Sequence, residues 1–230
     1  MAGQAWDSRL ARRIARPLAA MRVHPNHVTA ASMLLGLAAA AGYASGSPRG
    51  MGWGAVLYVL SAVLDHVDGE VARLTGTSSA AGQTFDRVAD LVVRFTLFAG
   101  MGVGLRVSPL GLPGVAFGVA AGLAFVAIFG LRGATARLRG WDAVGQPTAA
   151  GFDLEDILYV IAPLTWLGWL GPFVVAAGIG APLFALWCAR NHLEARRQMR
   201  RAAAPESAPL SAPAPSRPAA GDGLVVARRF

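Results

Sequence analysis

The chain has 230 residues, 54% of them hydrophobic, and its mean hydropathy is +0.46. Several of its apolar runs are too long to remain in water, so the composition excludes an ordinary soluble protein and indicates a polytopic membrane protein with one compact domain. All 21 basic residues are arginine, which excludes a Schiff-base lysine and a Walker-type phosphate lysine. The formal charge of +8 comes from arginines that flank apolar runs, so we expect anionic membrane lipids, and not nucleic acid, as the partner.

Residues 1–23 are predicted to form a juxtamembrane segment that contains an amphipathic surface helix over about 4–22. Apolar residues recur in it near helical spacing, with arginines between them, and such a helix lies in the plane of the lipid headgroups. The apolar positions are Trp6, Leu10, Ile14 and Leu18.

Residues 24–190 are predicted to form an all-α integral membrane domain with six transmembrane helices. Roughly 18–20 apolar residues are needed to cross a bilayer. The six expected spans are Val28–Ser45, Met51–Asp68, Gly82–Gly104, Leu110–Leu131, Asp153–Leu170 and Pro172–Ala189.

The distribution of arginine predicts the orientation of these spans. Arginines are frequent in the N-terminal segment, in the 132–139 loop and in residues 190–201, whereas the opposite loops hold only Arg49 and Arg106. The positive-inside rule then places both termini in the cytoplasm, with the protein in the cell membrane. Residues 191–230 are predicted to be a tail that is first basic and then disordered and rich in alanine and proline.

Four aspartates stand out in the stretch 64–94. Asp65 and Asp68 are three residues apart, and Asp86 and Asp90 are four apart, so on helices each pair shares a face. Both pairs are expected at the cytoplasmic ends of adjacent membrane helices, where four unpaired carboxylates would repel one another and lose hydration. A hard divalent cation with oxygen ligands would offset this repulsion and loss of hydration. Two such cations would suit phosphoryl transfer.

The alternative is that these aspartates only cap helices or extend toward the interface. That explanation is adequate for one aspartate, but each carboxylate within a membrane is expensive, and two pairs at helical spacing favour a metal site.

The stretch also fits the signature D-x2-D-G-x2-A-R-x8-G-x3-D-x3-D and thereby resembles the CDP-alcohol phosphotransferase (phosphatidyltransferase) family. The matching positions are Asp65, Asp68, Gly69, Ala72, Arg73, Gly82, Asp86 and Asp90, with every spacing kept. The segment Pro25-Asn26-x2-Thr29 is also similar to this family. The resemblance implies a six-helix membrane fold, a homodimer and a polar cavity that faces the cytosol.

The resemblance implies roles for these residues. Metal, as Mg²⁺ or Mn²⁺ and two ions per active site, would be bound by Asp65, Asp68, Asp86 and Asp90, with Asp90 also the general base. The CDP-linked donor would be bound by Asn26, Thr29, Asp68, Gly69, Ala72, Arg73 and Gly82. For Asn26 an N-cap of the first span is an equally good interpretation, because the residue directly precedes an apolar run.

Three further polar residues accompany the motif. Arg94 lies four residues after Asp90, and is interpreted either as its i,i+4 partner or as an anion site for the acceptor alcohol. His66 lies off the face shared by Asp65 and Asp68 and is expected to be a bystander. Arg87 is expected to face the cytosol or another helix.

The sequence therefore predicts an enzyme that moves a substituted phosphate from a CDP-alcohol to a small polar alcohol and releases CMP, in phospholipid biosynthesis. CDP-diacylglycerol is the expected donor. The acceptor stays open among inositol phosphate, glycerol phosphate, serine and another phospholipid. The competing interpretation is a non-catalytic metal-binding membrane protein or a transporter, which explains the aspartates but not the glycines and the Ala72-Arg73 pair at fixed spacing.

Overall fold

The computed structural model describes residues 6–140 and 160–202, with side chains for 11–140 and 160–200. Within these ranges the chain is helical. The α-helices are α1 (Trp6–Ala20), α2 (Pro25–Ala44), α3 (Pro48–Thr75), α4 (Ala80–Gly104), α5 (Gly111–Arg139), α7 (Ile161–Trp166) and α8 (Leu170–Ala202), and a 3₁₀ turn, η1 (Leu105–Val107), follows α4.

Five of these helices are long and apolar enough to cross a membrane: α2, α3, α4 with its 3₁₀ turn, α5 and α8. The predicted all-α integral membrane class is thereby confirmed. The predicted span Asp153–Leu170 lies partly outside the described residues, and its described part holds the short helix α7. Three helices run past the predicted span ends: α3 reaches Thr75, α5 reaches Arg139 and α8 reaches Ala202. In α5 and α8 the added residues are arginine-rich stretches that continue the helix.

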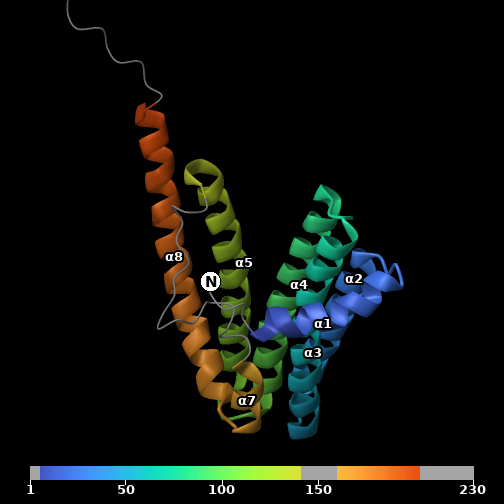
Figure 1. Ribbon diagram of the computed structural model, residues 1–230. Coiled ribbons are helices and arrows are strands. Elements are labelled where there is room, and N and C mark those ends of the chain that lie inside the picture. The colour runs from blue at the N-terminus through green and yellow to red at the C-terminus, as the bar shows by residue number, and fades with distance from the viewer. Residues whose placement is uncertain (1–5, 141–159, 203–230) are drawn as a thin grey trace, which may run out of the picture.

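Figure 1 shows which ends of the long helices lie at the same end of the molecule. The C-terminal ends of α3, α5 and α8 lie toward one end of the molecule, and α7 lies toward the other. Because α4 follows α3 after only a short turn, its first residues stand at the same end as the last turns of α3. Both aspartate pairs therefore come to one end of the helical bundle.

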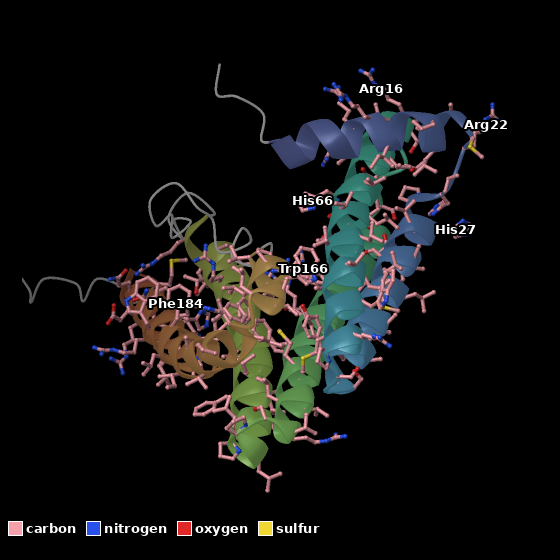
Figure 2. The ribbon with its side chains drawn as sticks, turned by 90° about the horizontal axis from the view of Figure 1, so that it is seen from below. Arg16, Arg22, His27, His66, Trp166 and Phe184 are labelled. Atoms are coloured by element: carbon pink, nitrogen blue, oxygen red, sulfur yellow. The ribbon has the colours of Figure 1, made fainter. Side chains whose placement is uncertain are left out.

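Helix α1 lies crosswise over the C-terminal part of α3 (Figure 2). Its apolar residues Ala11 and Ala15 are fully buried, and they pack with Val28 of α2 and with Val67 and Val71 of α3. The predicted amphipathic helix is therefore present, and its apolar face packs on the protein. This contact fixes the N-terminal segment beside the aspartate-bearing end of α3.

Glycines allow the long helices to approach closely. A Cβ atom at Gly118 of α5 would lie 2.5 Å from the carbonyl oxygen of Phe98 and 2.7 Å from Cα of Gly102, both in α4. A Cβ at Gly42 of α2 would lie 3.0 Å from Cα of Gly54 in α3. Small residues at such crossings let backbones pack directly, which is how membrane helices gain contact without a strong hydrophobic driving force.

A pair of buried serines joins α2 to α3. The hydroxyl of Ser32 donates to the Ser61 carbonyl oxygen at 2.9 Å, and the hydroxyl of Ser61 donates to the Ser32 carbonyl oxygen at 2.8 Å. Both residues are almost fully buried. The reciprocal bonds fix the register of the two helices about one turn below Thr29 and Asp65.

The glycine contact between α4 and α5 makes a matched pair of substitutions informative. Gly118→Ala is expected to lower the midpoint of thermal unfolding, since the new methyl would meet backbone atoms and overpacking destabilises by roughly 1–3 kcal/mol. Gly130→Ala, in the same helix, is expected to leave the midpoint unchanged or to raise it. A Cβ at Gly130 meets no described atom within 4 Å, and alanine is the better helix former. Equal midpoints for the two variants in detergent would contradict the close α4–α5 contact.

Candidate active site

The four aspartates lie on two helices joined by a tight turn. Asp65 and Asp68 are in the last turns of α3, and Asp86 and Asp90 are in the first turns of α4. Gly76 caps the C-terminus of α3, and its φ of 65° is in the left-handed region that glycine adopts without strain. Helix α4 begins after Ser79, whose hydroxyl accepts a hydrogen bond from the Gly82 N–H at 3.0 Å. These caps end one helix and start the next within a few residues.

Three of the four carboxylates converge. Asp65, Asp68 and Asp86 each offer an oxygen, and these three atoms all lie within 4.8 Å of one another. Carboxylate oxygens are the ligands that Mg²⁺ and Mn²⁺ prefer, and this spacing suits a shared divalent cation. The cluster therefore fits the predicted metal, and a bound cation would offset the repulsion among the three charges.

Asp68 is held from the neighbouring helix. It is only 5% exposed, and the Thr29 hydroxyl of α2 donates to its Oδ2 at 2.5 Å. Thr29 is itself 3% exposed. The predicted donor contact Thr29 thus also orients a member of the carboxylate cluster.

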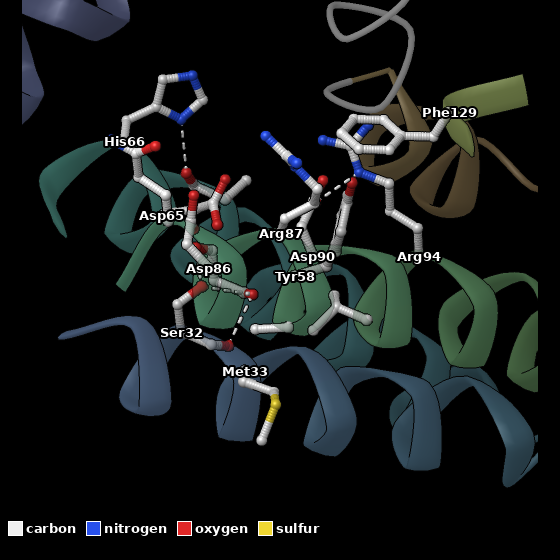
Figure 3. A pocket seen from close by; sticks show the side chains of 15 residues that line it. Ser32, Met33, Tyr58, Asp65, His66, Asp86, Arg87, Asp90, Arg94 and Phe129 are labelled. Carbon is white, nitrogen blue, oxygen red and sulfur yellow. Dashed lines mark hydrogen bonds and ion pairs between the residues drawn. The ribbon is translucent and has the colours of Figure 1, made fainter. Parts of the chain in front are cut away.

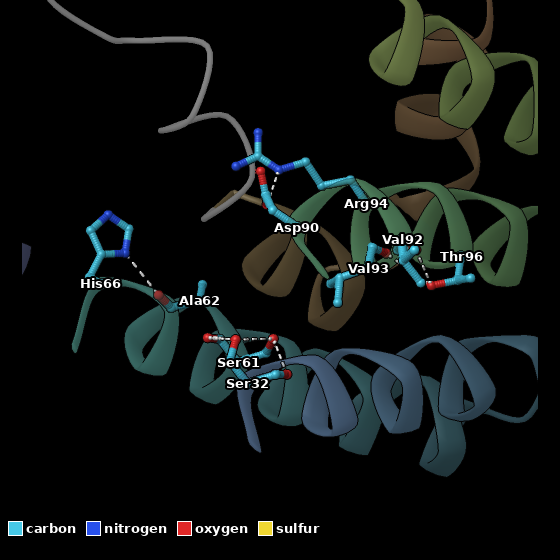
Figure 4. Close-up of polar contacts among 9 residues, drawn as sticks. All are labelled: Ser32, Ser61, Ala62, His66, Asp90, Val92, Val93, Arg94 and Thr96. Atoms are coloured by element: carbon cyan, nitrogen blue, oxygen red, sulfur yellow. Dashed lines mark hydrogen bonds and ion pairs between the residues drawn. The ribbon is translucent and has the colours of Figure 1, made fainter. Parts of the chain in front are cut away.

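Asp90 lies outside the three-carboxylate cluster. Nε of Arg94 donates to its Oδ1 at 2.6 Å in an i,i+4 ion pair, as Figure 4 shows. Both side chains are mostly buried, with 18% and 16% of their surfaces exposed. The interpretation of Arg94 as the i,i+4 partner of Asp90 is therefore confirmed.

A cavity of about 230 Å³ lies on one side of the cluster. Its lining includes all seven residues predicted to bind the donor, which are Asn26, Thr29, Asp68, Gly69, Ala72, Arg73 and Gly82. A Cβ at Gly82 would lie 3.2 Å from Oδ1 of Asn26, so the absence of a side chain lets α4 approach the start of α2.

Two residues around this cavity have partners that sequence reasoning did not identify. Arg73 pairs with Glu70 at 2.9 Å, and its side chain is 64% exposed. The N-cap of α2 is His24, whose Nδ1 accepts from the N–H of Asn26 at 3.2 Å. The interpretation of Asn26 as the N-cap is therefore wrong, because the helix begins at Pro25 and its N-cap lies two residues before Asn26.

A second cavity, of about 400 Å³, borders the cluster at Asp65 and Asp86 (Figure 3). Asp65, Asp86, Asp90 and Arg94 line it together with residues that were not predicted as site residues, among them His66, Gln83, Arg87 and Phe129. The two cavities have Gln83 and Asp86 in common. The carboxylate cluster therefore stands between two hollows.

The structure places His66 and Arg87 in the lining of the second cavity. His66, expected to be a bystander, lies there with its Nδ1 donating to the Ala62 carbonyl oxygen at 2.8 Å. Arg87, expected to face the cytosol or another helix, lines the same cavity. The recurrence of polar residues at 83, 87, 90 and 94 follows helical spacing and was the available signal for Arg87. Phe129 comes from α5, and no local pattern indicates it.

Comparison with known proteins covers the part of the chain that forms this site. A family model described as CDP-alcohol phosphatidyltransferase matches residues 22–178. A CDP-diacylglycerol–serine O-phosphatidyltransferase of Helicobacter pylori strain J99 is 43% identical over 77 residues, and the same enzyme of strain 26695 is 42% identical over 77 residues. Each alignment covers 33% of this chain and 31% of the relative. The family match extends over more than half of the chain and includes the cluster and most of both cavities, and the chain therefore belongs to the CDP-alcohol phosphatidyltransferase family.

Proposed function

We propose that the protein transfers a substituted phosphate group from a CDP-alcohol, with CDP-diacylglycerol as the donor, to the hydroxyl of a small polar acceptor. The products are CMP and a phospholipid. The observation that carries this proposal is the position of the three-carboxylate cluster between two cavities. One cavity gathers the residues expected to hold the donor, and the other gathers Asp90 and two arginines.

On the donor side, the small residues leave room for the nucleotide close to the helix backbone. Gly69 and Ala72 line the cavity from α3, and Gly82 lines it from α4. Arg73, which is largely exposed and paired with Glu70, has a planar guanidinium that is able to bind the diphosphate when the donor enters. Thr29 keeps Asp68 oriented toward the cluster.

On the acceptor side, the alcohol oxygen attacks the β-phosphorus of the donor. The bond between that phosphorus and the bridging oxygen breaks, and CMP leaves with the bridging oxygen. Asp90 accepts the proton of the attacking hydroxyl as the new bond forms. The ion pair with Arg94 holds the Asp90 carboxylate in place before the acceptor arrives.

Mg²⁺ or Mn²⁺, two ions per active site, would be held by Asp65, Asp68 and Asp86, with Asp90 able to contact the second. Bound there, the cations would neutralise charge on the diphosphate. The oxygen-only donor set of the cluster supports this choice of metal.

The acceptor in this proposal carries an anionic group. Arg87 and Arg94 both line the second cavity, and a guanidinium pairs well with a carboxylate or a phosphate. The two Helicobacter relatives are named as serine transferases, which supports serine, whose carboxylate would serve as the anionic group. Glycerol phosphate and inositol phosphate meet the same requirement.

The proposal extends to the assembly and its orientation. We infer six membrane spans, the fifth within Asp153–Leu170. We also infer that the protein forms a homodimer in the cell membrane. Both termini of each chain would lie in the cytoplasm. The arginine-rich ends of α5 and α8 support this orientation, because they lie at the aspartate-bearing end of the bundle.

The direct test is an incubation of the purified protein with CDP-diacylglycerol, Mg²⁺ or Mn²⁺ and a panel of alcohols. The panel comprises serine, glycerol phosphate, inositol phosphate and inositol, with CMP release and lipid mass as readouts. CMP and a new phospholipid are expected together. Metal binding without CMP release for any alcohol would support the non-catalytic alternative.

The first prediction from the proposed function concerns the cluster. Asp65→Asn, Asp68→Asn and Asp86→Asn are each expected to lower turnover by more than about 100-fold, since even residues that only orient a metal ligand contribute roughly 10- to 100-fold. Turnover is also expected to stop when a chelator removes the divalent cation. Glu194→Gln, an exposed acid on α8, is the matched control and is expected to retain activity. Substantial turnover without metal would rule out the metal-assisted mechanism.

The second prediction separates Asp90 from the cluster. Asp90→Asn is expected to retain metal and donor binding but to lower kcat by about 10²- to 10⁴-fold, because a general base acts in the transition state. Donor binding is measured by titration with CDP and kcat by CMP release. Loss of donor binding in Asp90→Asn would instead identify Asp90 as mainly a metal ligand.

The third prediction concerns Arg94. Arg94→Ala is expected to raise KM for an anionic acceptor about 10- to 100-fold, as for loss of a charge-assisted hydrogen bond, with little change in donor affinity. KM for an uncharged acceptor such as inositol is expected to change little. Arg137→Ala, an exposed arginine of α5, is the control. An unchanged acceptor KM together with loss of folded protein would identify Arg94 as a structural partner of Asp90 alone.

The fourth prediction concerns orientation. Single cysteines placed at 4, 138 and 205, in a Cys188→Ser background, are expected to be shielded from an impermeant thiol reagent in intact cells. The reason is that the arginine-rich segments remain on the cytoplasmic side. The same cysteines are expected to react once the membrane is permeabilised. Labelling of any of the three in intact cells would contradict the orientation.

A further inference from the structure

A third cavity, of about 600 Å³, lies apart from the carboxylate cluster. It is formed where the end of α1, the start of α2 and the end of α3 meet. The residues that matter for its chemistry are Arg16, Arg22, His24, Val23, Pro25 and Leu74. Pro25 and Thr77 also line the donor cavity, so the two hollows are neighbours.

The charged side chains described around this cavity are all basic. Arg16 and Arg22 contribute two guanidinium groups and His24 an imidazole, and no carboxylate is among the lining residues that the structure describes. In the described part of the chain the ion pairs found belong to Arg73 and Arg94, and neither Arg16 nor Arg22 has one. Two guanidinium groups without an acidic partner, beside aliphatic side chains, suit a ligand that is anionic and partly apolar.

The backbone at Arg22 gives an independent indication. Helix α1 ends with the Arg22 N–H bonded to the Ala19 carbonyl oxygen and the Val23 N–H bonded to the Leu18 carbonyl oxygen, both at 3.0 Å. This pair of bonds is a Schellman motif, in which glycine is the usual residue at the left-handed position. Arg22 occupies that position with a φ of 56°. Every other described residue with a positive φ is a glycine. A strained conformation that persists at an arginine points to a use for its side chain.

The position of the cavity suggests where the ligand comes from. Helix α1 lies crosswise to α3 (Figure 2), as expected of a helix in the plane of the headgroups. Arg16 and Arg22 stand near its C-terminal end, where the chain turns into the first membrane span. In the headgroup plane the anions at highest local concentration are lipid phosphates. Arginines of juxtamembrane segments bind these phosphates.

We propose that this cavity binds the phosphate headgroup of an anionic phospholipid, with Arg16 and Arg22 as its ligands. The aliphatic side chains of Val23, Pro25 and Leu74 contact the glycerol and upper acyl region. The bound lipid would fix the turn between α1 and α2 next to the donor cavity. This site is separate from the transfer reaction and does not depend on the proposed acceptor.

The test measures lipid retention by the full-length protein in detergent, using native mass spectrometry with phosphatidylglycerol or phosphatidylcholine added. The wild type is expected to retain phosphatidylglycerol in preference. Arg16→Ala and Arg22→Ala are each expected to weaken retention about 10-fold. Arg12→Ala and Arg13→Ala remove the same charge from exposed positions of α1 outside the cavity, and they are expected to retain the lipid. Equal losses in both pairs, or no preference for phosphatidylglycerol, would overturn the proposal in favour of diffuse attraction.

Arg22→Gly separates binding from stability. Glycine relieves the left-handed strain, so the thermal midpoint is expected to rise while phosphatidylglycerol retention falls about as far as in Arg22→Ala. Unchanged retention in Arg22→Gly would overturn the proposal. Inorganic phosphate alone serves as the second probe, and at millimolar concentration it is expected to leave retention unchanged. Displacement of the lipid by inorganic phosphate, dependent on Arg22, would identify a site for free phosphate and overturn the assignment to lipid.

Discussion

The closeness of three carboxylates at the end of two membrane helices is the constraint on which this structure depends. Asp65, Asp68 and Asp86 present oxygens within 4.8 Å of one another, and like charges at that distance repel strongly where little water surrounds them. The arrangement persists because the surrounding groups hold it. Thr29 donates to Asp68 from α2, and Arg94 pairs with Asp90 one turn further along α4. A divalent cation bound by the three carboxylates would neutralise the repulsion that remains.

Helix packing away from the cluster also helps to hold the carboxylates in place. The reciprocal bonds of Ser32 and Ser61 fix α2 against α3, and the register they set brings the Thr29 hydroxyl within 2.5 Å of Asp68. The close passage of Gly118 past α4 brings α5 near enough for Phe129 to reach the second cavity. Each of these contacts involves backbone atoms of a neighbouring helix, and such close packing holds in place a site whose charged groups would otherwise move apart.

Local spacing predicted the parts of the site that lie on one helix. The i,i+3 and i,i+4 relations indicated the shared faces of the aspartate pairs, and the same rule anticipated the ion pair of Asp90 and Arg94. Contacts between helices were not predictable in this way. The bond from Thr29 to Asp68 joins residues 39 positions apart, and neither residue type identifies the other as its partner. The N-cap of α2 was missed for a different reason: histidine is an uncommon cap, and Asn26 was the more ordinary choice.

The two cavities on either side of the cluster bear on how a displacement at phosphorus would proceed. In an in-line displacement the attacking and leaving oxygens approach and depart on opposite sides of the phosphorus. Here the small residues Gly69 and Gly82 line one hollow, Asp90 and Arg94 line the other, and Asp86 belongs to both. In the proposed function, a diphosphate held at the cluster would have Asp90 on one side and the small residues of the donor cavity on the other. Thr29, which bonds to Asp68, lines the first hollow, and Arg94, which pairs with Asp90, lines the second. The groups that stabilise the carboxylates therefore also border the two spaces that the proposed function assigns to the substrates.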